Sequence, residues 1–153
     1  MALYADTEIL SALLSHVAGL DLEPALSIAW PNTQFPPSGE ALPASYLRVD
    51  VVPNRNQNPW LADDDETWHR GLLVLAVSFQ EGRGAITPSK VAGAIADHFA
   101  MGTQLRRSGL IIEIYEQPSV GGGDWNPDSN RYEMQVTMRW QCFVPFDFPQ
   151  KGA

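Results

Sequence analysis

The feature that most constrains this chain is an alternation of apolar and polar residues in its last quarter. From Tyr132 to Val144 every even position is apolar, and every odd position except Phe143 is polar. Successive side chains of a strand point to opposite faces of a sheet, so this pattern predicts a long antiparallel strand with one face in water. Cys142 falls on the apolar side of the pattern, and we expect it to be buried and chemically inert.

Two segments have the spacing of amphipathic helices. The first begins at Asp6 or Thr7, either of which can cap the first turn, and Gly19 is placed to end it. The second is expected between residues 87 and 102, with Thr87 as its cap and Pro88 at its first position. The stripes expected to face a sheet are Ile9, Leu10, Leu13, Leu14, Val17 and Leu20 in the first helix, and Val91, Ile95 and Phe99 in the second.

Four further segments are predicted to be strands. They are a short one within Leu26–Trp30, a half-buried one at Tyr46–Val52, a central one at Leu72–Gln80, and one at Leu110–Glu116. Two helices on one sheet make a two-layer sandwich. The sequence therefore predicts an α+β fold in which a mixed, mainly antiparallel sheet of four to five strands packs with two helices.

Long loops connect these elements within one domain spanning residues 1–153. Residues 53–70 are polar, acidic and rich in Asn and Pro, and residues 117–130 contain Gly121-Gly122-Gly123. We expect both segments to be long and flexible. The chain has no internal repeat and no linker between domains, and its length suits a single core.

Composition excludes several classes of function. The formal net charge of −8, with only ten scattered Lys and Arg residues, argues against a nucleic-acid clamp. One cysteine cannot form an internal disulfide or a thiolate metal cluster. We read no signal peptide at the N-terminus and no apolar run of the roughly 18 residues that a membrane span needs, and we expect synthesis in a reducing cytoplasm and no membrane contact.

An acidic run is the first candidate for chemistry. Asp63, Asp64, Asp65 and Glu66, together with His69, offer the groups of a hard-cation site or of an acid–base pair. However, adjacent carboxylates do not converge on one point, and the alternating spacing and central glycine of a calcium loop are missing. A solvated loop tip is the simpler interpretation, and a small metal-dependent hydrolase is kept as an alternative function.

Other motifs are incomplete. Gly82-Arg83-Gly84 follows a strand and opens a helix, but Thr87 stands where a dinucleotide fingerprint needs its third glycine and no P-loop lysine follows. We therefore expect a tight turn with glycines at positive φ. His16 and His98 are expected to be surface or packing residues, and no cofactor is expected.

Aromatic residues in loops are the remaining signal. Trp30, Phe35, Trp60, Trp68 and Trp125 lie in or beside Pro- and Gly-rich segments. Large aromatic side chains anchor protein interfaces, although each could also fold back onto its own core. The residues predicted to contact a subunit or partner are Trp60, Asp63, Asp64, Asp65, Trp68 and Trp125.

The order of short phrases along residues 5–145 resembles a known family. After the first helix come Ile28-Ala29-Trp30-Pro31-Asn32 and Phe35-Pro36-Pro37, then Tyr46-Leu47-Arg48-Val49 and Gly71-Leu72-Leu73-Val74-Leu75-Ala76-Val77. Gly82-Arg83-Gly84 precedes the second helix, and His98-Phe99-Ala100-Met101-Gly102 ends it. This order resembles the tail terminator and tail-completion proteins of long-tailed phages and of phage-like gene transfer particles.

The resemblance implies a non-enzymatic structural protein of the virion or phage-like particle. It implies a mixed sheet flanked by helices, assembled as a hexameric ring that caps the tail tube and joins it to the head. The expected partners are other copies of the chain, the tail tube protein and a head-completion or connector protein, while DNA passes through the channel without specific binding. Another head-to-tail connector or a minor tail component is the alternative.

Overall fold

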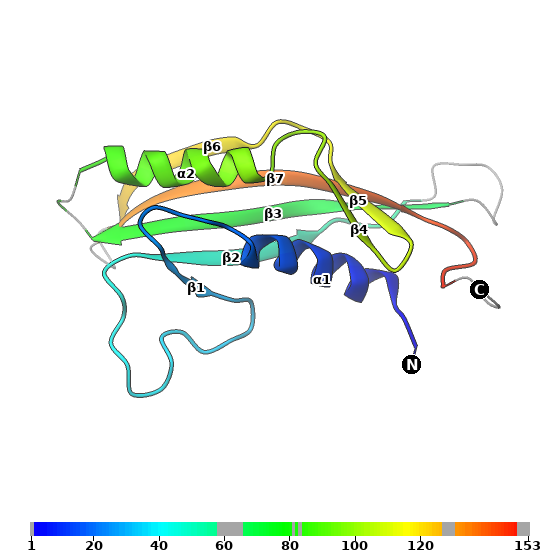
Figure 1. Cartoon of the computed structure of the whole chain (residues 1–153), viewed down its shortest axis with the longest axis horizontal. Helices are drawn as coiled ribbons and strands as arrows, with labels where there is room; N and C mark the ends of the chain where they lie inside the picture. Colours follow the sequence, from blue (N-terminus) through cyan, green and yellow to red (C-terminus); the bar gives the residue numbers. More distant parts are fainter. Residues whose placement is uncertain (1, 58–65, 81, 83, 127–130, 150–153) are drawn as a thin grey trace.

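The computed structural model describes residues 2–57, 66–80, 82, 84–126 and 131–149, and it has the predicted α+β class (Figure 1). The helices are α1 (Ala5–Ala18) and α2 (Ile86–His98). The strands are β1 (Ser27–Ala29), β2 (Tyr46–Pro53), β3 (Thr67–Gln80), β4 (Gln104–Arg107), β5 (Leu110–Ile114), β6 (Ser119–Asn126) and β7 (Arg131–Val144). The described chain thus has a sheet of seven strands, and the prediction of four to five was too low.

The sheet is mixed and has its two longest strands at its centre. The strand order is β1-β2-β3-β7-β5-β4, and β6 also pairs with β7. β1 runs parallel to β2, whereas the remaining pairs are antiparallel. β3 and β7 pair along their whole length, from Thr67 opposite Val144 to Gln80 opposite Arg131. β5 and β6 follow one another along the other edge of β7.

The alternation in the last strand is confirmed. Val136, Met138, Trp140, Cys142 and Val144 are all buried, while Gln135, Arg139 and Phe143 on the other side are exposed. Cys142 retains only 1 % of its accessible surface. The wet and dry faces of β7 are therefore those that the sequence predicted.

The helices bury most of the predicted stripes, but Leu10 of the first stripe is 39 % exposed, and the starts of both helices differ from the prediction. Ile9, Leu13 and Val17 of α1, and all three stripe residues of α2, are in the core. Neither Asp6 nor Thr7 caps α1, whose N-cap is Tyr4, and α2 begins with Ala85 as N-cap, so that Thr87 and Pro88 lie inside its first turn. Gly19 does end α1, whereas α2 ends before Gly102, with Phe99 as C-cap.

Two strands were not predicted, and both loops are shorter than expected. β4 and β5 form a hairpin through Ser108 and Gly109, whose φ angles of 53° and 82° are those of a two-residue turn. β6 occupies residues 119–126 of the segment predicted as a loop at 117–130, because β7 offers it a free edge to pair with. Similarly, β3 begins at Thr67, inside the segment predicted as a loop at 53–70.

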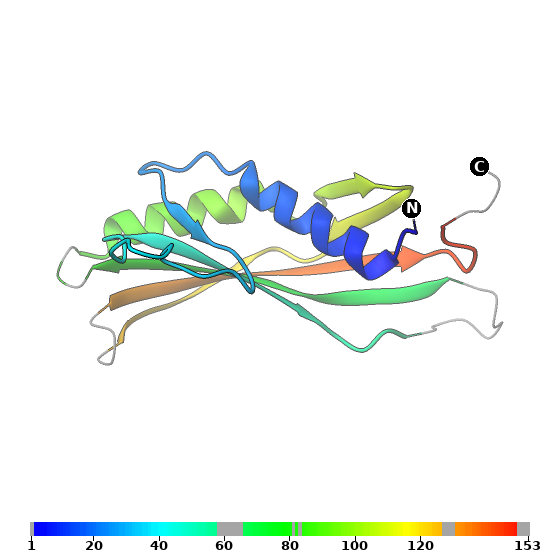
Figure 2. The same ribbon diagram turned by 90° about the horizontal axis from the view of Figure 1, so that it is seen from below.

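The elements form two layers. Both helices cover one face of the sheet, and the β4–β5 hairpin at its edge lies on the same side (Figure 2). Within the described residues no helix covers the opposite face. α2 packs against β3, β6 and β7, and α1 packs against β4 and β5. The N-terminal residues and the end of β7 lie at the same end of the molecule (Figure 1). The uncovered face of β2, β3 and β7 is called here the open face.

Candidate assembly surface

The open face has an apolar centre with charged residues on the strands beside it. Leu72 and Val74 of the central strand β3 point to this face and are half-buried, and Val52 of β2 is 47 % exposed. The polar residues in register beside them are Asp50 on β2 and Thr137 and Arg139 on β7, and Arg48 and Gln135 flank the next open-face position of β3, Ala76. An antiparallel sheet commonly leaves one face in water, but that face is then mainly polar. Apolar residues at its centre favour a contact with another protein surface.

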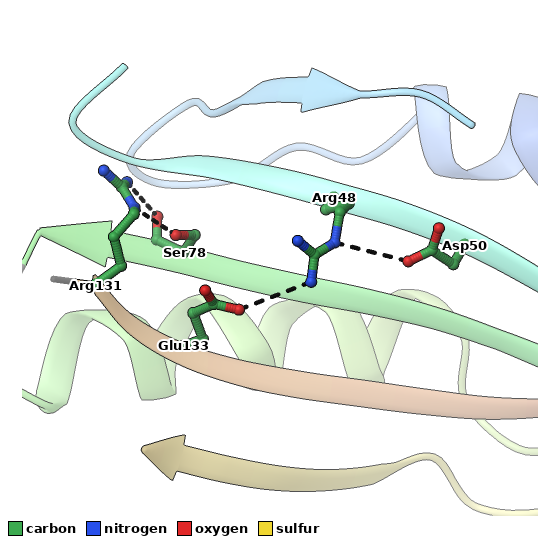
Figure 3. Close-up of polar contacts among 5 residues, drawn as sticks. All are labelled: Arg48, Asp50, Ser78, Arg131 and Glu133. Atoms are coloured by element: carbon green, nitrogen blue, oxygen red, sulfur yellow. Dashed lines mark hydrogen bonds and ion pairs between the residues drawn. The ribbon is translucent and has the colours of Figure 1, made fainter. Parts of the chain in front are cut away.

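Arg48 links the two strands that flank β3 on this face. Its Nε lies 3.7 Å from Oδ2 of Asp50, and its Nη2 lies 3.8 Å from Oε2 of Glu133 on β7 (Figure 3). The side chain reaches across β3 because the residues beneath it, Ala76 and Ser78, are small. Arg48 and Asp50 are each about half exposed, so each ion pair contributes little by itself, on the order of 0–1 kcal/mol.

Arg131 is a buried cation at one end of the open face. Its Nε donates to Oγ of Ser78 at 2.6 Å (Figure 3). Its Nη2 donates to the carbonyl of Ala44 at 2.6 Å. The guanidinium also lies over the ring of Tyr46, 4.9 Å from its centroid. Among the described residues no carboxylate forms an ion pair with Arg131. Its neutral partners fix the segment that leads into β2 onto the sheet.

Trp68 lies in the sheet rather than in a loop. It occupies β3, and its ring stacks on Phe143 of β7 with centroids 6.1 Å apart. Its Nε1 donates to Oε1 of Gln141 at 3.2 Å, and the guanidinium of Arg70 lies 4.2 Å from its ring centroid. Trp68 therefore continues the open face to the start of β3, and its indole N–H already has a hydrogen-bond partner within the subunit.

The other predicted contact residues are not brought together by the described chain. Trp125 lies in β6 with its backbone opposite Tyr132, and not in a loop. Trp60, Asp63, Asp64 and Asp65 lie outside the described residues. The open-face residues Leu72 and Val74 of β3 were missed because a central strand with apolar residues on both sides gives no sign of which side is left uncovered. Val52 of β2 was missed because the alternation places it on the polar side of its strand.

The histidine of the acidic run points to helix α1. His69 is 7 % exposed, and its Nδ1 lies 2.9 Å from Oδ1 of Asp6. Asp6 also lines a cleft of about 620 Å³ between α1 and the end of β2, with Ile9 and Trp140 among its other lining residues. Within the described ranges, no three metal-ligating side chains gather in one place.

His69 also stands opposite Cys142 on the neighbouring strand, so that a thiol, an imidazole and Asp6 share one region. Nucleophilic chemistry would require the thiolate. Burial raises the pKa of the Cys142 thiol to about 11, and the nearby Glu66 charge acts in the same direction. The thiol is therefore protonated at neutral pH, and these three residues do not make an activated nucleophile.

The glycines that resembled a phosphate-binding motif act as a turn. Gly82 and Gly84 have φ angles of 82° and 86°, as the interpretation as a tight strand-to-helix turn predicted. Helix α2 starts directly after them at Ile86. None of the helices in the described chain is both long and apolar enough to cross a membrane.

Comparisons with known proteins agree with this geometry. One solved structure superposes with a TM-score of 0.65 at 21 % sequence identity, over 92 % of this chain and 95 % of the other chain, which shows a shared fold. No curated protein matches the sequence. A family model described as phage tail terminator protein matches residues 8–140, which include most of α1, all of α2 and most of the sheet. The chain therefore belongs to the phage tail terminator protein family.

Proposed function

We propose that this protein closes the end of a phage tail as a ring of identical copies, hexameric by the resemblance noted above. The family match over residues 8–140 carries the proposal and gives the chain a structural role in a phage tail. In the proposed assembly the ring caps the tail tube on one side and meets a head-completion or connector protein on the other. The protein acts as a component of the particle and not as an enzyme.

The open face is the surface that we assign to the contact between neighbouring copies. Its apolar centre of Leu72, Val74 and Val52 gains most from removal from water, at roughly 25 cal/mol per Å² of apolar surface buried. The charged residues Arg48, Asp50 and Glu133 beside that centre give the contact its orientation. The Trp68–Phe143 stack extends the contact to the start of β3. Trp60, Asp63, Asp64, Asp65 and Trp125 are proposed as further contacts of the ring.

The charge of the chain suits a channel through which DNA passes. With 18 Asp and Glu residues against ten Lys and Arg, the chain carries a formal net charge of −8. Binding to a phosphate backbone is driven by clustered cations, whereas an acidic wall repels phosphates and leaves the duplex free to slide. DNA is accordingly proposed to pass through the ring without specific binding.

Electron microscopy of the purified protein, alone and with the tail tube protein, tests the ring. Val74→Arg should abolish rings, because the new side chain blocks the open face, while Asp50 directly opposite on β2 accommodates its charge within the subunit. Ile86→Arg is the matched control, since Ile86 is 71 % exposed on the helix-covered side.

Thermal melting of both variants should stay close to that of the natural protein. If the natural protein forms no ring under either condition, the proposed function is wrong. If both variants form rings, the proposed ring is supported, but the open face is not the contact surface between its subunits.

A further inference from the structure

Two histidines join the C-terminal ends of the helices. His16 lies in the last turn of α1 and His98 is the last residue of α2. Their rings stack with centroids 3.9 Å apart and planes 14° from parallel. The Nε2 atom of each ring lies 2.8 Å from the backbone carbonyl oxygen of the other residue. Phe99 packs against both rings in edge-on geometry. The two helix ends are thus connected by a reciprocal, closed arrangement.

The two carbonyl acceptors determine which nitrogen of each ring carries the hydrogen. A carbonyl oxygen only accepts, so each Nε2 carries a hydrogen and donates it. In the neutral state each Nδ1 therefore holds a lone pair and is the atom that takes up a proton in acid. A proton there leaves both hydrogen bonds in place but turns the ring into a cation. Two such cations at a centroid distance of 3.9 Å repel one another in a partly desolvated place.

Burial and the neighbouring ring oppose the protonation of His16. Burial lowers the pKa of His16, the hydrogen bond with the carbonyl of His98 acts against this, and the charge on His98 lowers the pKa further. Asp21 and Asp97, the carboxylates nearest in sequence, are exposed, and in the described chain neither forms an ion pair with an imidazole.

The charged residues on the elements packed against the helices are engaged elsewhere. On the hairpin beside α1, Arg107 pairs with Glu8 in the first half of the helix, and Glu113 accepts a hydrogen bond from Gln104. β3 and β7 present mainly apolar residues to the helix-covered side, such as Leu75 and Val136. The titratable exception on β3 is His69, which contacts Asp6 in the first turn of α1, at the other end of that helix from His16. The described neighbours therefore provide no ion pair to neutralise a second positive charge on the pair.

We propose that His16 and His98 form an acid-sensitive joint between α1 and α2. Both hydrogen bonds between the helix ends are formed while the two rings are neutral, and we call this state closed. The joint stays closed when one ring takes up a proton, because the terminal carbonyls of both helices favour a single positive charge. It opens when both rings are protonated, which separates the two helix ends while the sheet beneath them stays formed. This device is independent of the proposed role in the tail.

Thermal melting between pH 8 and pH 5 tests the joint. An unfolded histidine takes up its proton near pH 6.5, so a ring that resists protonation in the folded state stabilises the protein fully above that pH. That stability is lost as the pH falls below 6.5 toward the lowered pKa of His16. The double variant His16→Gln/His98→Gln keeps amide donors at both positions and cannot titrate. Between pH 7.5 and pH 5.0, the midpoint of the natural protein should fall by about 3 °C or more beyond the fall of the variant.

The natural protein and the double variant both contain His69 and every carboxylate. The contribution of these groups to the pH dependence of the melting midpoint therefore cancels when the two are compared. Equal falls in the two midpoints would overturn the proposal. A second measurement decides the matter if the variant does not fold, namely an NMR titration of the imidazole resonances in the natural protein. The stacked rings should titrate as a coupled pair in two steps, with the amides of Gly19 and Phe99 shifting in the second. Independent, single-step titration of both rings without amide shifts would likewise overturn it.

Discussion

Replacing Gly71 by alanine should be among the most damaging single changes in this sheet. Gly71 is a buried residue of β3, opposite Pro53 on β2 and Trp140 on β7. A Cβ atom at this position would lie 2.5 Å from the carbonyl oxygen of Val52, 2.7 Å from Cζ2 of Trp140 and 2.9 Å from Cα of Pro53. The indole therefore occupies the space that a side chain on Gly71 would need.

The loss of stability caused by Gly71→Ala depends on which neighbouring atoms would have to move. Ordinary contacts of a Cβ begin at 3.4 Å, so the Val52 carbonyl would have to retreat by about 0.9 Å. Two of the three close atoms belong to the backbone of the paired strand β2 and cannot rotate away. Overpacking a core costs about 1–3 kcal/mol, and backbone neighbours place Gly71→Ala at the upper end, about 3 kcal/mol. For a domain of this size the melting midpoint should drop by about 6–12 °C.

Gly93→Ala is the matched control. Gly93 lies on the exposed side of α2, and a Cβ there meets nothing within 4 Å. The same glycine-to-alanine change should therefore stabilise the helix by about 1 kcal/mol, because alanine loses less backbone freedom on folding. Circular dichroism melting of both variants beside the natural protein measures the two effects. A Gly71→Ala midpoint within 2 °C of the natural value would refute this reasoning, because β2 and the indole would then have yielded without cost.

Three further changes test the polar interior. Arg131→Ala should lower stability by about 2–4 kcal/mol in a urea unfolding titration, because the carbonyl of Ala44 and the hydroxyl of Ser78 lose a charged donor; an unchanged midpoint would mean that water replaces the guanidinium freely. Glu8→Gln should cost about 1–2 kcal/mol in the same assay, since the buried carboxylate accepts a hydrogen bond from Ser108 and pairs with Arg107 at 3.6 Å. Cys142 should react with a thiol reagent only after denaturant is added, because the thiol is buried and protonated at neutral pH; rapid labelling of the native protein would contradict the strand register.

Two predictions from the sequence failed because distant contacts outweigh local residue preferences. They are the cap of α1 and the loop at residues 117–130. Asp6 is a good capping residue by type, but its carboxylate contacts His69 on β3, a residue 63 positions away in the chain. β6 has three consecutive glycines and little intrinsic preference for a strand, and the free edge of β7 supplies its hydrogen bonds. At Gly122, whose φ is 86°, an added Cβ would lie 3.1 Å from the carbonyl oxygen of Glu133. The glycines that predicted a loop thus serve a bulge at the edge of the sheet.

The family was also accessible from the sequence. The order of short phrases along residues 5–145 indicated a tail terminator, and the family match over residues 8–140 confirms it. The candidate contact surface was only partly accessible. Trp68 was named, but as a loop residue, and its stack on Phe143 joins two strands whose pairing no local pattern reveals.

The sequence by itself determined the features that depend on periodicity. The alternation in β7 defines which of its faces is buried, and the helical stripes define which sides of α1 and α2 meet the sheet, because side-chain direction repeats regularly within each element. The tertiary structure decided what depends on distant partners. The close approach at Gly71, the buried Arg131 and the stack of His16 on His98 each need two or more elements to meet, and their energies arise only where those elements are in contact. The side of the sheet left without helices was decided in the same way, because β3 is apolar on both sides and only the path of the chain selects the side that the helices cover.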